Sequence, residues 1–156
     1  MIVTQKNQYA IRAIYELACH KGDDPLKIAD IAKAQAIPMR FLEVILAKMK
    51  RSGMVTSKRG YAGGYTLVRP PDQIKVVEVL QHMQDNSRPV RCTACEIKGN
   101  CPFDQNCVFL PMWQAVENAI AGVLSNTTIA DLMDNAKGVA QEPKKKQKAA
   151  PPLRTF

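Results

Sequence analysis

The sequence has few of the features that mark secreted, membrane-embedded or catalytic proteins. Its 156 residues include only two histidines, His20 and His82, and we find no Ser/His/Asp set, phosphate-binding glycine loop or supported acid/base pair. No apolar run approaches the roughly 20 residues that a membrane span needs, and the chain opens on an amphipathic pattern rather than a secretory signal. No internal repeats are visible. We therefore expect a cytoplasmic protein that is neither an enzyme nor membrane-bound.

The net charge of +8 is distributed unevenly along the chain. Residues 1–75 carry 13 Lys and Arg against 6 Asp and Glu, residues 76–136 carry 3 against 7, and residues 137–156 carry 6 against 1. A basic first half suits a polyanion such as DNA, although basic stretches are also common on ordinary solvated surfaces. Residues 137–156 are dominated by Pro, Lys, Ala and Gln, which cannot bury a core, so a disordered basic tail is expected there.

Hydrophobic periodicity predicts a mainly α-helical fold with one small β-hairpin. The predicted helices cover about residues 5–20, 27–35, 38–52, 74–84, 110–124 and 129–133, and the predicted strands cover about 54–58 and 65–68. Thr4 is typical of a helix N-cap, and Thr128 with Asp131 forms a capping pattern before the last helix. Three helices followed by a hairpin indicate a winged helix-turn-helix domain at residues 1–75. A cysteine-containing loop and further helices then fill residues 76–136.

The third predicted helix has one face suited to a protein core and another suited to a DNA major groove. Placed at about 100° per residue, its apolar residues fall on one side: Leu42, Ile45, Leu46 and Met49. The opposite side holds charged and small apolar residues: Arg40, Glu43, Val44, Ala47, Lys50 and Arg51. An ordinary helical hairpin would show the same apolar pattern, and Ala36 stands where a helix-turn-helix usually prefers Gly. The segment alone therefore leaves DNA binding open.

The predicted hairpin favours the DNA-binding interpretation. Five cations and no acid lie within residues 48–59: Lys48, Lys50, Arg51, Lys58 and Arg59. A flexible basic wing fits phosphate contact and the insertion of arginine into a minor groove, although its glycines would equally serve a tight turn. The candidate DNA-binding residues are Arg40, Glu43, Val44, Lys50, Arg51, Lys58, Arg59 and Gly60.

Four of the five cysteines lie within residues 92–107. Disulfides are rare in the cytosol, so a cluster this tight is more typical of a metal site. The candidate metal ligands are Cys92, Cys95, Cys101 and Cys107. Their thiolates could hold an iron–sulfur cluster or a structural zinc ion, or they could act as redox thiols without a metal. Cys19 lies apart on the first helix and is predicted to be an inert packing thiol.

These motifs together resemble the Rrf-two family of winged-helix transcriptional regulators over about residues 1–135. The matching segments are Thr4 with Tyr9-Ala10, Ile28–Ala32, Phe41–Glu43, Arg59-Gly60 with Gly63–Tyr65, the three-cysteine loop, Trp113 and Thr127–Leu132. The resemblance implies a homodimer that pairs through the long helix at about residues 110–124 and binds a palindromic double-stranded operator. It also implies that Glu43 helps to read bases and that Arg59 enters the minor groove.

The resemblance further implies an iron–sulfur cluster of the 2Fe–2S or 4Fe–4S type on three regularly spaced cysteines: Cys95, Cys101 and Cys107. We therefore expect a regulator that senses iron–sulfur, redox or nitric oxide status. The fourth ligand departs from the family, because Leu110 replaces a histidine of some members and Gln8 replaces an N-terminal aspartate of others. Cys92 is our candidate substitute. The alternative is a winged-helix DNA-binding protein with a structural zinc site or redox thiols and no cluster.

Overall fold

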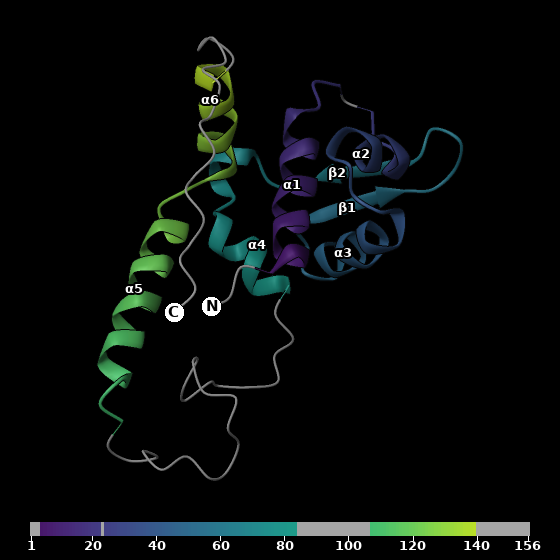
Figure 1. The fold of residues 1–156 in the computed structure, drawn as a ribbon. Coiled ribbons are helices and arrows are strands. Elements are labelled where there is room, and N and C mark those ends of the chain that lie inside the picture. Colours follow the sequence, from purple (N-terminus) through teal and green to yellow (C-terminus); the bar gives the residue numbers. More distant parts are fainter. Residues whose placement is uncertain (1–3, 23, 84–106, 140–156) are drawn as a thin grey trace, which may run out of the picture.

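The computed structural model describes residues 4–22, 24–83 and 107–139, and in these ranges the chain is mainly helical with one antiparallel hairpin (Figure 1). The elements are α1 (Gln5–Cys19), α2 (Ile28–Gln35), α3 (Met39–Arg51), β1 (Val55–Lys58), β2 (Gly64–Leu67), the 3-10 turn η1 (Pro71–Gln73), α4 (Val76–Met83), α5 (Leu110–Ser125) and α6 (Ile129–Val139). The predicted fold class is confirmed. None of the described helices has the length and apolarity that crossing a membrane requires.

Short polar side chains set the starts of the first and last helices, as predicted. The Thr4 hydroxyl accepts a hydrogen bond from the backbone N–H of Asn7 at 3.3 Å. Before α6, the Thr128 N–H donates to the Asp131 carboxylate at 2.8 Å, and the Asp131 N–H donates to the Thr128 hydroxyl at 3.1 Å. This reciprocal capping box satisfies two backbone donors that the helix cannot pair internally. The backbone N–H and the hydroxyl of Thr128 both donate to the Asp131 carboxylate, and these two bonds lower the pKa of Asp131 below its ordinary value.

Several helix boundaries differ from the predicted ones, and three of the differences are instructive. Pro38 is the extended N-cap of α3 rather than its first helical residue. Ile74 is extended and fully buried, because its carbonyl accepts from the Ile129 N–H at 2.9 Å instead of joining α4. Helix α6 continues to Val139, supported by an ion pair of 2.7 Å between Lys137 and Asp134, so the first three residues of the predicted tail are helical. Residues 140–156 lie outside the described residues.

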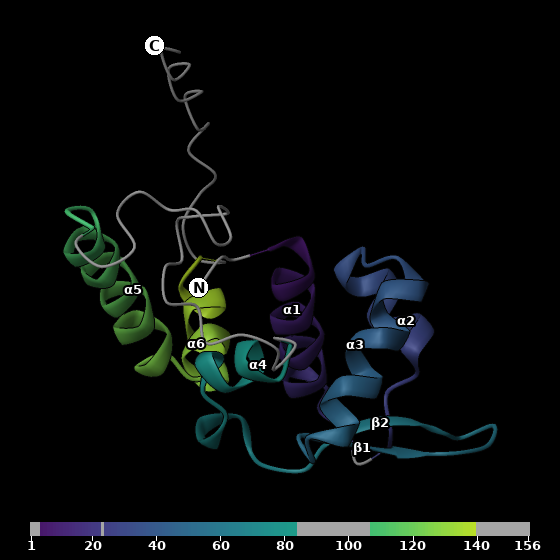
Figure 2. The ribbon, with the colours of Figure 1, turned by 90° about the horizontal axis from the view of Figure 1, so that it is seen from below.

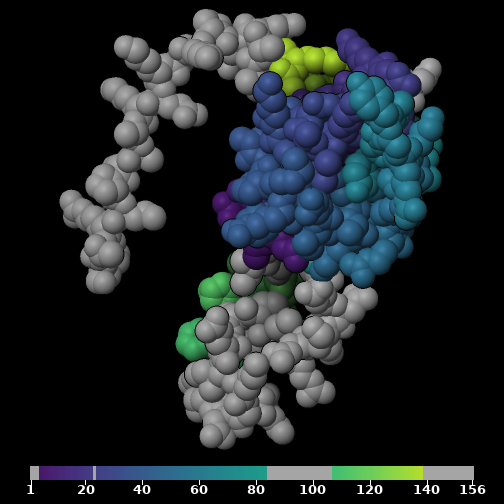
Figure 3. All heavy atoms as spheres, turned by 90° about the vertical axis from the view of Figure 1, so that its right-hand side faces the viewer, coloured from purple at the N-terminus to yellow at the C-terminus, as the bar shows by residue number. Residues whose placement is uncertain are grey.

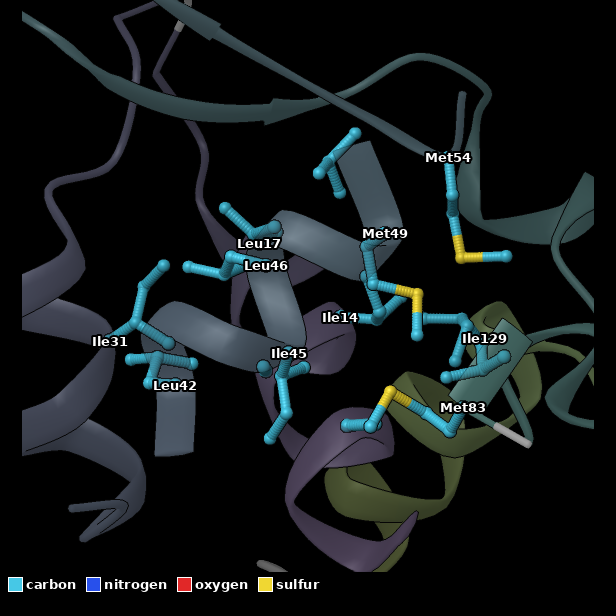
Figure 4. Close-up of a cluster of buried hydrophobic side chains, with 14 of the residues drawn as sticks. Ile14, Leu17, Ile31, Leu42, Ile45, Leu46, Met49, Met54, Met83 and Ile129 are labelled. Carbon is cyan, nitrogen blue, oxygen red and sulfur yellow. The ribbon is translucent and has the colours of Figure 1, made fainter. Parts of the chain in front are cut away.

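The core lies where α1, α3 and α4 meet the base of the hairpin (Figure 4). Side chains of α3 enter it from one face only, as the helical periodicity predicted, and Ile14 of α1 faces them. Fully buried members include Ile14, Ile31, Leu42, Ile45, Leu46, Met49, Met54 and Ile129. This packing fixes α3 by its inner side and leaves its outer side for solvent.

Helices α4 and α6 also attach to this core. Val79 is fully buried, and the N–H of Val76 donates to the carbonyl of Thr127 at 2.9 Å, which ties α4 to the segment before α6. Ile129, the first residue of α6, is buried among the same side chains. The core therefore includes residues on both sides of the predicted domain boundary at residue 75.

The hairpin pairs β1 with β2 in antiparallel register from Val55 opposite Leu67 to Lys58 opposite Gly64. The segment before α2 adds a short third edge, where the N–H of Leu26 donates to the carbonyl of Tyr65 at 3.0 Å. This bridge holds the hairpin against the helix-turn-helix. The loop between β1 and β2 projects beyond α2 and α3 (Figure 2).

Candidate nucleic-acid interface and cysteine site

The turn between α2 and α3 sets the direction in which α3 leaves the core. Ala36 adopts the left-handed conformation, with φ of 49° and ψ of 46°. The next residue, Ile37, is buried, and its N–H donates to the carbonyl of Ala32 at 3.0 Å. The left-handed Ala36 ends α2, and the buried Ile37 anchors the turn to the core. Together they fix the orientation of α3 relative to α2, as a helix-turn-helix requires.

A polar network that the sequence did not predict joins α1 to the end of α2. The guanidinium of Arg12 donates to the side chain of Gln35 at 3.2 Å and also to its backbone carbonyl. The Gln35 amide donates in turn to the carboxylate of Glu16 at 2.6 Å. These bonds tie Gln35, at the end of α2, to side chains that lie 19 and 23 residues earlier in the sequence. No local sequence pattern predicts a contact over such a separation.

The outer face of α3 carries three of the predicted DNA-binding residues. Arg40, Glu43 and Val44 are all exposed, and Val44 is exposed by 49%. Ala47 continues the same stripe one turn later and is exposed as well. The predicted division of α3 into a core side and an outer side is thus confirmed, and the outer side is free of covering structure in the described part of the chain.

The end of α3 and the start of the hairpin form a basic surface. Lys50 donates to the Ser57 hydroxyl at 2.6 Å, which connects the last turn of α3 to β1. Arg51, Lys58 and Arg59 are exposed, and within the described ranges none of these three is paired with a carboxylate. Unpaired cations on a fixed scaffold can bind phosphate without first breaking an internal ion pair.

The tip of the hairpin is shaped by glycine. Gly60 has a φ of 105°, which a residue with a side chain rarely adopts, and a Cβ on Gly63 would collide with the backbone of Lys58 and Arg59. Between them, Tyr61 is exposed by 96%, and the Lys27 ammonium lies 4.9 Å from the centre of its ring. Sequence reasoning missed this pair, because Lys27 precedes α2 and only the fold brings it to the wing.

All eight predicted DNA-binding residues therefore lie on the exposed surface of α3 and the hairpin. Figure 3 shows this side of the molecule, where α2, α3 and the hairpin lie next to one another. Arg40 lies at the start of α3, Glu43 and Val44 lie in its middle, and Lys50 and Arg51 lie at its end. The remaining three belong to the wing: Lys58, Arg59 and Gly60. The arrangement presents a helix flanked by a basic loop, a shape that fits a major groove and its neighbouring backbone.

The structure describes one of the four predicted metal ligands. Cys107 is a half-buried free thiol three residues before the start of α5, and its carbonyl accepts from the Leu110 N–H at 3.1 Å. Cys92, Cys95 and Cys101 lie outside the described residues. Among the residues that are described, no group of three or more His, Cys, Asp or Glu could hold a metal ion.

His20, His82 and Cys19, which the sequence places outside the cysteine loop, all belong to the described part of the chain. His20 is exposed and contacts the Asp24 carbonyl at 3.0 Å, and His82 is exposed on α4. Cys19 is half-buried at the end of α1, where its hydrogen bond with Tyr15 raises the pKa of that tyrosine. His20 and Cys19 are thus engaged in contacts with residues near them in the sequence.

Helix α5 lies on the opposite side of the molecule from α2 and α3 (Figures 1 and 2). None of its described side chains is fully buried, although the helix is mostly apolar. Met112 is exposed by 51%, Trp113 by 37%, Val116 by 43% and Val123 by 67%. An apolar stripe of this size on one helix is typical of a surface that another protein covers.

Comparison with known proteins agrees with this architecture. The family model Rrf2, described as an iron-dependent transcriptional regulator, matches residues 3–135. The HTH-type transcriptional regulator IscR of Cronobacter sakazakii is 32% identical over 135 residues, which cover 86% of this chain and 82% of the relative. IscR of Escherichia coli is 30% identical over 155 residues, which cover 99% of this chain and 94% of the relative.

Solved structures show the same likeness. The structure titled T. potens IscR superposes with a TM-score of 0.71 at 29% identity and covers 93% of this chain and 94% of that chain. CymR, the global cysteine regulator of B. subtilis, gives a TM-score of 0.67 at 25% identity, covering 86% of this chain and 98% of that one. The helix-turn-helix, the hairpin and the long helix described above are thus parts of an architecture shared with known regulators.

Proposed function

The chain belongs to the Rrf2 family of transcriptional regulators, and on that premise we propose that it binds a palindromic double-stranded operator as a homodimer and adjusts this binding through an iron–sulfur cluster. As a regulator of transcription it is not an enzyme. Its place of action is the cytoplasm, where the DNA is. The observation that carries the proposal is the exposed surface formed by α3 and the basic hairpin.

In the proposed complex, α3 enters the major groove and the hairpin follows the adjoining backbone. Glu43 accepts hydrogen bonds from base donors, whereas Lys50, Arg51 and Lys58 contact phosphates. Arg59 enters the minor groove beside Gly60, whose φ of 105° turns the chain at the tip. Because several cations contact phosphates, affinity falls steeply as salt concentration rises.

The proposed homodimer pairs through α5. A second copy would cover the exposed apolar stripe, and two-fold symmetry would match the two halves of a palindrome. Sedimentation velocity tests this: the wild type is expected to be a dimer and Val116→Asp a monomer, because a carboxylate would be buried at the interface without a partner. A monomeric wild type at micromolar concentration would contradict the proposed assembly.

The cysteines would hold the cluster at the start of this same helix. Cys95, Cys101 and Cys107 supply three thiolates, and Cys92 is the proposed fourth ligand, since the first position of α5 is the apolar Leu110. The described member of the set fits this role, because Cys107 is a half-buried free thiol at the N-terminal end of α5, where helix amides favour negative charge. When bound, the cluster would supply a redox-sensitive group there. Iron rather than zinc is supported by the description of the matched family as iron-dependent.

Anaerobic purification followed by a visible spectrum and analysis of iron and sulfide tests the cluster. A coloured protein that contains both elements is expected, whereas a zinc site or free thiols would leave it colourless. Ala substitution of Cys95, Cys101 or Cys107 should abolish the absorption, and Cys19→Ala, which removes a cysteine outside the loop, should leave it unchanged.

The fourth ligand is tested by comparing two further variants. Cys92→Ala is expected to lose iron and to become more sensitive to oxygen, whereas Gln8→Ala should match the wild type. Full occupancy and unchanged oxygen sensitivity in Cys92→Ala would refute the assignment of Cys92. Loss of iron in Gln8→Ala would point instead to a ligand at that position.

A further inference from the structure

A large apolar side chain, Val44, lies in the middle of the outer face of α3, next to charged residues. Arg40, Glu43, Val44 and Ala47 follow the i, i+3, i+4, i+7 spacing of a single helical stripe, and all four are exposed. Val44 is the larger of the two apolar members, with 49% of its surface exposed. Lys50 and Arg51 continue the stripe at its end.

Folding of the described chain gives no reason for valine at this position. Its immediate neighbours on the inner face, Leu42, Ile45 and Leu46, are fully buried and complete the core without it. Valine is also a poorer helix former than alanine, because its branched side chain loses rotamer freedom in a helix. An exposed valine in the interior of α3 therefore does not stabilise the helix, and its apolar surface is available to a partner.

The major groove offers one apolar group to such a side chain. Among the four bases only thymine carries a methyl group at the groove edge, whereas the other recognition atoms there are hydrogen-bond donors and acceptors. The valine side chain can neither donate nor accept a hydrogen bond. A contact between Val44 and a base therefore contributes to binding only where a methyl group of the base replaces water against the side chain. A polar or charged residue would instead form hydrogen bonds with the donors and acceptors at the base edges.

We propose that Val44 is a specificity-determining residue that selects a thymine in each half of the operator by packing against the 5-methyl group. The inference rests on the proposed function, because it requires α3 to lie in the major groove. It adds a base preference that the charged residues of the same face cannot supply. Since burying one methyl group is worth about a fourfold change in binding, each half-site contributes about that factor.

Replacement of thymine by uracil removes this methyl group without changing base pairing. A duplex that binds tightly would first be selected from random sequences with the wild-type dimer. Each thymine of one half-site would then be replaced by uracil in turn, with the other half-site unchanged. Dissociation constants would be measured by fluorescence anisotropy. The proteins compared would be the wild type, Val44→Ala and Val68→Ala, the last a matched control whose valine is 57% exposed outside α3.

At one thymine of the half-site, uracil is expected to weaken the binding of the wild type and of Val68→Ala about fourfold. The binding of Val44→Ala should not change at any thymine. Val44→Ala should remain folded, because the substitution opens no cavity and improves helix propensity. Equal weakening of all three proteins, or no sensitivity at any thymine, would overturn the inference while leaving the proposed function intact. If no duplex were selected over random DNA, the proposed function itself would be wrong.

Discussion

Replacing Ala36 by glycine should stabilise the protein, although glycine normally weakens helical segments. Ala36 is the only residue other than glycine with a positive φ among those described. The left-handed conformation costs an L-residue about 1–2 kcal/mol. Glycine avoids this cost but gives the unfolded chain extra freedom worth about 0.4–1 kcal/mol. The difference lies between about 0 and 1.6 kcal/mol and centres on about 0.8 kcal/mol of net stabilisation, which corresponds to about 2–3 °C in Tm for a chain of this size.

Urea unfolding at one fixed protein concentration measures this effect. The midpoint for Ala36→Gly should rise while the slope of free energy against urea stays constant, because the folded structure and its buried surface do not change. Ala34→Gly, two residues earlier on an exposed face of α2, is the matched control. Its helical backbone gives glycine no advantage, so it should lose up to about 1 kcal/mol.

Opposite signs for the two variants would confirm that the backbone of the turn is strained at Ala36. Equal destabilisation would show that alanine is accommodated there without cost, and the account of the turn would then be wrong. DNA affinity should be unchanged in Ala36→Gly, since Ile37 still anchors the turn and α3 keeps its direction.

Three further predictions concern the wing, an ion pair and the end of the chain. In a sequence-selection assay, Arg59→Ala should lose preference at A·T-rich minor-groove positions, and Glu43→Ala should relax base choice by about 1–3 kcal/mol per base pair; unchanged selectivity in both would remove them from the reading surface. The ion pair with Arg69 lowers the pKa of Glu78, so its contribution is present above the ordinary pKa of glutamate and is lost as pH falls through the lowered value. Glu78→Gln should therefore cost about 0.2–1 kcal/mol at neutral pH, measured by urea unfolding, and nothing once the wild-type carboxylate is protonated; a cost independent of pH would contradict the pairing. Removal of residues 140–156, which carry five Lys and Arg against one Glu, should leave Tm unchanged and weaken non-specific DNA binding; dissociation of the dimer would show that they are structural.

Local sequence patterns predicted those parts of the structure that depend on near neighbours. The inner and outer faces of α3 follow from its periodicity, because the spacing of Leu42, Ile45 and Met49 leaves only one side to the core. The capping pair of Thr128 and Asp131 likewise depends on residues three apart. In each case the residues that determine the feature lie within one or two helical turns.

Contacts between distant segments could not be predicted in the same way. Lys27 meets Tyr61 only because the bridge between Leu26 and Tyr65 brings the start of α2 to the hairpin. The extended conformation of Ile74 depends on its hydrogen bond to the start of α6, which no local pattern specifies. The cysteine site remains a prediction for all four cysteines, of which Cys92, Cys95 and Cys101 lie outside the described residues.

In the proposed function, one protein reads an operator with α3 and changes its affinity for DNA with the state of its cysteine-bound cluster. The most direct measurement is the Kd for a selected palindromic duplex under anaerobic conditions, before removal of the cluster, after removal and after its reconstitution. We expect one dimer per palindrome and a Kd that differs at least about tenfold between the two states, a coupling of about 1.4 kcal/mol. The original Kd should return on reconstitution. A Kd that is the same with and without the cluster, or a protein that never acquires iron and sulfide, would contradict the proposed function.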